Sequence, residues 1–208
     1  MNLSKLLDWR GQTAVIAASG PSLTDAQINA VRAAGVRLIT TNTTHERAPW
    51  ADVHYACDLL WWKTNITKVR TKAACWTQDR ASAERWQLNW IRQAARPGLG
   101  TKDLHVNGNS GFGAINLAYL FGARRILLLG FDMREVGGRK HWHIDHPKPC
   151  VQNMPFKEWL FKSVALARDL EKEGCEVINC CLDSALTVFK KMPLEEALRG
   201  SQTPPPSA

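Results

Sequence analysis

The sequence predicts an α/β fold, a Rossmann-like three-layer sandwich whose central sheet is mostly parallel. Short apolar runs alternate with helical segments along most of the chain, which is the pattern of repeated strand–helix units. One run, residues 126–129 (ILLL), is apolar without interruption, as in a strand that helices bury on both faces. Polar turns follow one strand after another, and in such sheets ligands bind beyond the carboxyl ends of the strands.

The composition fits one globular domain. The chain has 208 residues, of which 45% are hydrophobic, and this is enough to fill a single core. We expect residues 1–199 to form this domain and residues 200–208 (GSQTPPPSA), which contain no apolar anchor, to form a disordered tail. No apolar run is long enough for a membrane span and no secretory signal is recognisable, so we expect a cytoplasmic protein with no membrane partner.

The charge and the less common residue types narrow the range of partners. The formal net charge of +8 favours anions such as nucleotides, phosphates or nucleic acid. The lysines and arginines are spread along the chain, however, and no run of five like charges forms a nucleic-acid-binding arm. The six cysteines include no Cys-x-x-Cys pair, which indicates reduced, mostly buried thiols. The nine tryptophans are either core and helix-face aromatics or platforms for stacking a base or a sugar ring.

The first strand is expected at residues 13–18 and runs directly into the turn of residues 19–22 (SGPS). A helix then begins near Thr24 or Asp25 and ends at Gly35, so backbone amides and a helix amino terminus can meet an anion here. A tight turn with side-chain capping explains the same residues equally well. The turn is neither a Walker A loop nor a GxGxxG fingerprint.

Two further strands are expected at residues 36–40 and 52–57, and a polar residue follows each of them at the same edge of the sheet. Asn42 follows the first of these strands. Its side-chain amide can form hydrogen bonds to a base or a ribose, or it can merely bond to the backbone of its own turn. Asp58 follows the second. Polar groups that follow three separate strands meet at one edge of the sheet. A shared ligand site explains this arrangement better than separate local roles in three turns do.

The segment between the third strand and the centre of the chain is expected to be mostly helical. It contains a possible further strand at residues 72–77 and a helix at residues 81–95 with an aromatic face. A loop at residues 96–100 and a short strand at residues 102–106 lead into the next segment.

The stretch from residue 107 to residue 132 is the part of the sequence relative to which the other predicted elements can be placed. It opens with a glycine-rich turn over residues 107–111, whose bare amides can approach a ligand closely. An apolar helix follows and ends at Gly122, and the buried strand at residues 126–129 comes after it. Asp132 stands just past the carboxyl end of that strand, which makes it a candidate catalytic residue.

Residues 133–153 contain too many glycines and prolines for a regular helix or strand, and the segment is longer than most simple connections. We therefore expect a functional loop or lid over the strand ends. This segment contains His141, His143 and His146. Histidines can ligate zinc, but this spacing is not that of a zincin helix and no Cys₂His₂ arrangement accompanies it, so we predict no metal site. Donating a hydrogen bond to phosphate, or exchanging a proton with a reacting group, requires only one of these three histidines.

The C-terminal part is expected to add the outer elements of the sandwich. Residues 156–173 form the most regular amphipathic helix of the chain, with Phe156 and Val164 on its apolar face. The last parallel strand is expected at residues 175–178, a polar turn follows it, and Pro193 begins a closing helix.

Taken in order, these motifs resemble a known framework. It is shared by the bacterial family 42 sialyltransferases and by the motility-accessory and 6-hydroxymethylpterin diphosphokinase-like proteins, including small phage-type members. The similar segments are IAASGPSL, TTN, YACD, NSGFGAINLAYLFGARRILLLGFDM, the histidine-bearing loop and VINCCLDSAL. The resemblance covers about residues 12–199, and its more specific parts are GPSL and the frame SGxxAxxLAxxxGxxxIxLxGxD.

The resemblance implies particular roles for residues of this chain. In the sialyltransferases the first turn, the Asn after the second strand and the turn before the long helix hold a cytidine nucleotide, and a His in the late loop is the general base. Carried over, the base falls on His143 or His146. The nucleotide contacts fall on Ser19, Gly20, Pro21, Ser22, Asn42, Asp58, Asn109, Ser110, Gly111 and Asp132.

Three functions follow as expectations. The first is a metal-independent glycosyltransferase with a nucleotide-sugar donor of the cytidine type, because the chain has no DxD motif and offers His and backbone amides instead. The second is a pterin-type diphosphokinase in which Asp58 and Asp132 hold Mg²⁺ between ATP phosphates. The third is a phage-type accessory protein that binds a nucleotide without turnover. The acceptor stays open, with a polyanion or nucleic acid among the candidates, and a homo-oligomer is compatible with the sequence.

Overall fold

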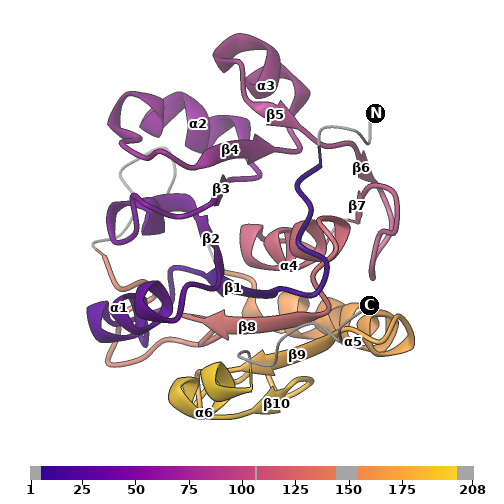
Figure 1. Ribbon diagram of the computed structural model, residues 1–208. Coiled ribbons are helices and arrows are strands. Elements are labelled where there is room, and N and C mark those ends of the chain that lie inside the picture. Colours follow the sequence, from indigo (N-terminus) through magenta and orange to yellow (C-terminus); the bar gives the residue numbers. More distant parts are fainter. Residues whose placement is uncertain (1–5, 106, 144–153, 201–208) are drawn as a thin grey trace.

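The structure, a computed structural model, describes residues 6–105, 107–143 and 154–200. Eight strands form its main sheet, and every pairing in that sheet is parallel (Figure 1). In spatial order they are β10 (Lys190–Lys191), β9 (Glu176–Asn179), β8 (Arg125–Leu129), β1 (Thr13–Ala17), β2 (Arg37–Thr41), β3 (Val53–Tyr55), β4 (Ala74–Thr77) and β5 (Asn89–Trp90).

Helices cover both faces of this sheet, which confirms the expected Rossmann-like α/β sandwich. Alternate residues of β1 enter two apolar cores, as the two-residue period of a strand requires. Ala14 and Ile16 pack in the core that contains α4 (Ser110–Leu120) and α5 (Phe156–Lys172). Val15 and Ala17 pack in the core that contains α1 (Asp25–Ala34) and α6 (Leu194–Arg199).

The order of strands reverses at β1. From β1 to β5 each strand is added on one side, whereas β8, β9 and β10 are added on the other. The carboxyl ends of β1 and β8, which are neighbours in the sheet, therefore lie at the switch point, where open α/β sheets leave a crevice for ligands.

Local signals explain the first helix well. The Thr24 hydroxyl oxygen accepts from the Gln27 N–H at 3.2 Å, and the Gln27 side-chain oxygen accepts from the Thr24 N–H at 3.0 Å, so a capping box begins α1. Gly35 ends it with φ +66°, a left-handed conformation that glycine adopts without strain. Because its own residues cap α1, this helix offers less to an anion than the sequence predicts.

The helix predicted at residues 81–95 is confirmed for residues 81–86 and wrong for the rest. Helix α3 (Arg80–Trp86) ends where Gln87 takes φ +54°, and β5 follows. Tertiary contacts outweigh the helical periodicity here: Ile91 is fully buried in the core, and the Trp90 indole N–H donates to the Gln78 carbonyl at 3.1 Å. A separate two-stranded sheet comes next, formed by β6 (Gln93–Ala94) and β7 (Leu104–His105).

The remaining differences are smaller. Val164 of α5 is 56% exposed, because Trp159, Ser163 and Leu166 form the buried face instead, so the predicted apolar face is rotated. β10, which pairs with β9, was not predicted because two lysines carry no strand signal. The tail at residues 201–208 and residues 144–153 of the predicted lid lie outside the described residues. No helix in the described part of the chain is long and apolar enough to cross a membrane.

Candidate functional site

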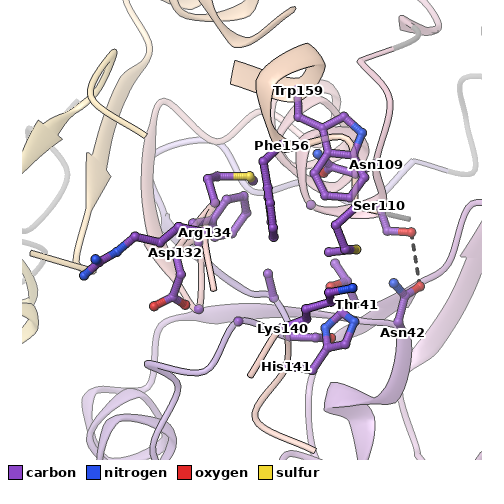
Figure 2. A pocket seen from close by; sticks show the side chains of 18 residues that line it. Thr41, Asn42, Asn109, Ser110, Asp132, Arg134, Lys140, His141, Phe156 and Trp159 are labelled. Atoms are coloured by element: carbon purple, nitrogen blue, oxygen red, sulfur yellow. Dashed lines mark hydrogen bonds between the residues drawn. The ribbon is translucent and has the colours of Figure 1, made fainter. Parts of the chain in front are cut away.

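A cavity with about 510 Å³ of empty space, part of it open to solvent, lies at the carboxyl ends of β1, β2 and β8 (Figure 2). We call it the switch-point cavity. The walls come from residues 18–20, 41–42, 109–111, 130–134 and 140–141, together with Met154, Phe156 and Trp159.

Close packing between the turns after β1 and β8 forms one wall of the cavity. The Gly20 N–H donates to the Gly130 carbonyl at 2.9 Å, and a Cβ on Gly20 would stand 2.3 Å from that oxygen and 2.1 Å from Asp132 Oδ2. Asp132 is only 5% exposed, and its Oδ2 accepts from the Ser22 N–H at 3.2 Å and the Ser22 hydroxyl at 2.9 Å. Asp132 thus ties the two turns together, and only glycine fits at position 20.

A polar pair joins the turn after β2 to the start of α4. The Ser110 hydroxyl lies 3.1 Å from Asn42 Oδ1, the bond drawn in Figure 2, and accepts from the Cys57 N–H at 3.3 Å. Asn42 has φ +48°, a left-handed conformation that Asn tolerates better than most residues and that often marks functional positions. Its side-chain NH₂ group makes no hydrogen bond with the described residues, so its donors are available to a ligand.

The amino terminus of α4 opens into the cavity. Asn109 is the N-cap, and its Oδ1 accepts from the Phe112 N–H at 2.9 Å. The N–H groups of Ser110 and Gly111, which both line the cavity, have no hydrogen-bond partner among the described residues. Two free amides at the end of an eleven-residue helix favour an anion such as phosphate.

The segment after β8 brings charge and a proton-exchanging group to the same cavity. Lys140 and His141 line it beside Thr41, whereas the guanidinium of Arg134 extends outward from the rim (Figure 2). Lys140 is half-buried, and its only ion pair among the described residues is a loose one with Glu135 at 3.8 Å. A partly desolvated ammonium group in the same cavity as free amides strengthens the attraction for phosphate.

Trp142 anchors this segment to the first turn. Its N–H donates to the Ser19 carbonyl at 3.0 Å, and its indole N–H donates to the Thr44 hydroxyl at 3.2 Å. The guanidinium of Arg47 lies 4.1 Å from the centroid of the Trp142 ring, a cation–π contact. The positions of the preceding residues are therefore set by contacts with the 3₁₀ helix η2 (Asn42–Glu46) and its neighbours.

Two cysteines next to the site have thiols with a raised pKa. Burial raises the pKa of the Cys57 thiol, and burial also raises the pKa of the Cys181 thiol. Cys57 donates to Asp58 Oδ2 at 3.1 Å, and Cys181 accepts from the Phe131 N–H at 3.1 Å. A raised pKa favours the protonated thiol, and both sulfur atoms take part in hydrogen bonds.

The structure gathers most of the residues that the sequence singled out. Pro21 and Ser22 belong to the first turn without lining the cavity, and Ser22 acts through Asp132. Asp58 lines a neighbouring cavity instead. The predicted residues that do line the switch-point cavity are Ser19, Gly20, Asn42, Asn109, Ser110, Gly111 and Asp132.

The three histidines have different positions. His141 lines the cavity, whereas His143 does not line it and stacks on His141, with ring centroids 4.9 Å apart and planes 3° from parallel. His146 lies outside the described residues. Among the described histidines, His141 is the one placed to exchange a proton with a ligand in the cavity.

Sequence reasoning did not single out Lys140, Phe156 or Trp159 as site residues. Phe156 and Trp159 begin α5 and contribute flat apolar surface to the cavity (Figure 2). One signal in the sequence could have indicated this role: the two aromatic residues begin a helix that directly follows the loop predicted over the strand ends. Nothing in the sequence distinguishes Lys140 from the neighbouring basic residues.

The fold and the cavity together define a class: a Rossmann-like α/β protein with a cavity at its switch point. Among the described residues, no group of three or more His, Cys, Asp or Glu is arranged to hold a metal ion. A comparison with protein-family models finds no matching family, and a comparison with curated proteins finds no similar sequence.

Proposed function

We propose that this protein is a nucleotide-dependent transferase, and in particular a metal-independent glycosyltransferase that binds a nucleotide-sugar donor in the switch-point cavity. The observation that carries the proposal is the convergence of two free α4 amides, Lys140 and His141 on one cavity that also has an aromatic wall. The resemblance of the motif series to the family 42 sialyltransferases supports the same donor class.

In this proposal each part of the donor has a partner. The phosphate lies against the N–H groups of Ser110 and Gly111 and near the Lys140 ammonium group. The base packs on Phe156 and Trp159, and the free NH₂ of Asn42 donates to a carbonyl oxygen of the base or to a ribose oxygen. A cytosine base, which presents a carbonyl oxygen, suits this donor.

The chemistry is an inverting displacement. An acceptor hydroxyl oxygen attacks the anomeric carbon, the bond from that carbon to the phosphate oxygen breaks, and its electron pair leaves with the nucleotide phosphate. His141 takes the proton of the attacking hydroxyl. The α4 amides and Lys140 stabilise the negative charge that develops on the phosphate.

The diphosphokinase alternative receives less support from the geometry. It requires Asp58 and Asp132 to hold Mg²⁺ around the same phosphates. Asp132 is bound by Ser22, and Asp58 lines a different cavity. The third alternative, an accessory protein without turnover, remains an outcome of the experiments below.

Thermal melting with a panel of nucleotides tests the proposal. In EDTA, CMP and CDP should raise the melting temperature, because a ligand at 100 times its Kd adds about 2.7 kcal/mol of stability. Stabilisation by ATP that depends on Mg²⁺, without an effect of CMP in EDTA, would favour the diphosphokinase instead. If no nucleotide changed the melting temperature, both enzyme functions would fail.

A histidine pair tests the mechanism. His141→Gln should bind CMP as tightly as the wild type but release CMP from a CMP-sugar roughly 100-fold more slowly, the usual range for losing a general base. His143→Gln is the matched control, and it should retain most of the rate because its ring lies behind His141. A full rate in His141→Gln would refute the assignment of the base.

A further inference from the structure

Helix α5 exposes two large apolar side chains on the side away from the core. Its buried face consists of Trp159, Ser163, Leu166 and Leu170. Phe161 is 81% exposed and Val164 is 56% exposed, more than any other large apolar side chain in the described part of the chain. One exposed apolar residue needs no explanation, but two neighbours on one turn of a helix indicate a surface that another molecule covers.

The exposed residues of α5 repeat with the spacing of a helix–helix contact. They are Lys157, Phe161, Val164, Arg168 and Glu171, which follow one another at intervals of four, three, four and three residues. All five are exposed. Their spacing is the 3.5-residue period of the positions that meet a partner helix in a coiled coil. We call these five residues the α5 seam.

The α5 seam is complementary to itself in the antiparallel direction. A two-fold axis at Val164 brings residues that are equally far before and after Val164 opposite each other in two copies. Lys157 of one copy then faces Glu171 of the other, and Phe161 lies against Arg168. The contact thus has an apolar centre, a cation–π contact on each side of it and an opposite-charge pair at each end.

The charged ends of the seam are free to make this pairing. Lys157 and Glu171 have no ion-pair partner among the described residues, and Arg168 pairs there only with its neighbour Asp169, at 3.0 Å. A parallel pair of helices would place Lys157 beside Lys157 and Glu171 beside Glu171, and like charges in contact are destabilising. The charges therefore favour the antiparallel arrangement.

A groove beside the second half of the seam can receive Phe161 of the other copy. It contains about 1130 Å³ of empty space, part of it open to solvent, between α5, β9 and the segment that leads into β10. Its apolar lining includes Val164, Ala167, Val188 and Phe189. Because Arg168 also lines the groove, the two-fold axis places Phe161 at its edge. A helix seam alone is narrow, and groove contacts in both copies widen it toward the roughly 1,200 Å² of a stable interface.

We propose that two copies of this chain associate through the α5 seam, antiparallel and about a two-fold axis at Val164, with Phe161 of each copy in the groove of the other. The inference goes beyond the proposed function and does not depend on it. The seam lies on the side of α5 opposite Trp159, which lines the switch-point cavity. Dimerisation and nucleotide binding are therefore separate properties of the chain.

Analytical ultracentrifugation of the full chain tests the proposal. The wild type should sediment as a dimer at micromolar concentrations. Phe161→Arg should raise the Kd of the dimer more than roughly 30-fold, the range for an aromatic anchor of an interface. Leu182→Arg is the matched control, because Leu182 is also an exposed apolar residue but lies outside α5 and the groove, and it should leave the Kd unchanged. Both positions are exposed, so both variants should fold, which thermal melting checks.

Charge reversal tests the antiparallel register. Lys157→Glu and Glu171→Lys should each raise the Kd roughly tenfold, because each places like charges opposite one another at both ends of the dimer. The double variant should regain the wild-type Kd, since the two charges are then exchanged and attract again. A wild type that stays monomeric at micromolar concentrations, a dimer that Phe161→Arg leaves intact, or a double variant as weak as the single ones would overturn the proposal.

Discussion

The two cavities on the carboxyl edge of the sheet share Asn109 but differ in chemistry. The switch-point cavity presents free helix amides, Lys140 and two large aromatic rings besides its carboxylate and carboxamides. The second cavity, which we call the side cavity, is lined by Asp58, Gln78, Gln93, His105 and Asn107 and has no lysine, arginine or large aromatic ring in its described lining. The difference follows from topology. The first opens where the strand order reverses, so the start of α4 meets the segment after β8, whereas the second lies over β3, β4 and the small sheet.

The largest expected effect comes from Gly20→Ala, which breaks only the switch-point cavity. The added carbon would meet the Gly130 carbonyl and the Asp132 carboxylate, so we expect the free energy of unfolding to fall by about 1–3 kcal/mol. The first turn would also be displaced, and CMP binding should vanish in calorimetry.

Gly35→Ala is the control for that variant. A Cβ at Gly35 has open space, but its φ of +66° makes the substitution strained, so stability should fall by about 1 kcal/mol while CMP affinity stays unchanged. If Gly20→Ala bound CMP as well as Gly35→Ala does, the close packing of the two turns would not matter for the ligand.

Acid should lower the stability of the fold, because two of its imidazoles are buried. Burial lowers the pKa of His54, on β3, to about 3 and also lowers the pKa of the neighbouring His45. Both imidazoles are neutral in the folded protein and gain protons near pH 6.5 when it unfolds. Their stabilisation is complete above pH 6.5 and is lost as the pH falls, at most about 1.4 kcal/mol per pH unit for each.

Chemical denaturation between pH 7 and pH 4.5 measures this dependence. His54→Asn keeps a side chain that can bond Thr40, whose hydroxyl lies 3.2 Å from His54 Nδ1, and should flatten the profile. An identical pH dependence in the variant and the wild type would show that the buried imidazole is not its source.

Lys140→Gln should weaken CMP binding about tenfold, because it removes one charge-assisted hydrogen bond to phosphate. Lys63→Gln is the matched control, since Lys63 is exposed on α2 (Leu59–Asn65) and lines neither cavity. Equal losses in both lysine variants would indicate a general charge effect and not a specific contact.

Ser22→Ala should have the smallest effect. It removes the hydroxyl bond to Asp132 at 2.9 Å but keeps the backbone N–H bond at 3.2 Å. We expect a loss of about 1 kcal/mol in the free energy of unfolding and a small decrease in CMP affinity. A loss of CMP binding as complete as that of Gly20→Ala would mean that Ser22 contacts the ligand directly.

Local sequence patterns predicted much of this fold because they report forces that act over a few residues. The apolar run of β8, the capping of α1 and the left-handed Gly35 are signals of this kind. The path through residues 87–105 depends on where Trp90 and Ile91 pack against distant strands, so periodicity predicted a helix there. β10 depends entirely on pairing with β9.

The site residues also divide into those that local sequence patterns predict and those that depend on distant contacts. Ser19, Gly20 and Asn42 could be predicted because they directly follow strands at one edge. Asp58 also follows a strand, but β2 separates β3 from β1, and at about 4.8 Å per strand Asp58 reaches the next cavity. Which histidine enters the cavity could not be predicted, because the bonds of Trp142 to Ser19 and Thr44 set that position.

Mapping CMP binding by chemical-shift changes of the backbone amides tests the central claim most directly. The account predicts that CMP in EDTA shifts the amides of Gly20, Ser110, Gly111 and Lys140, while the amides of Gln93 and of the groove at Glu171 and Glu176 do not move. Shifts confined to that groove, or no shifts at a saturating CMP concentration, would contradict it.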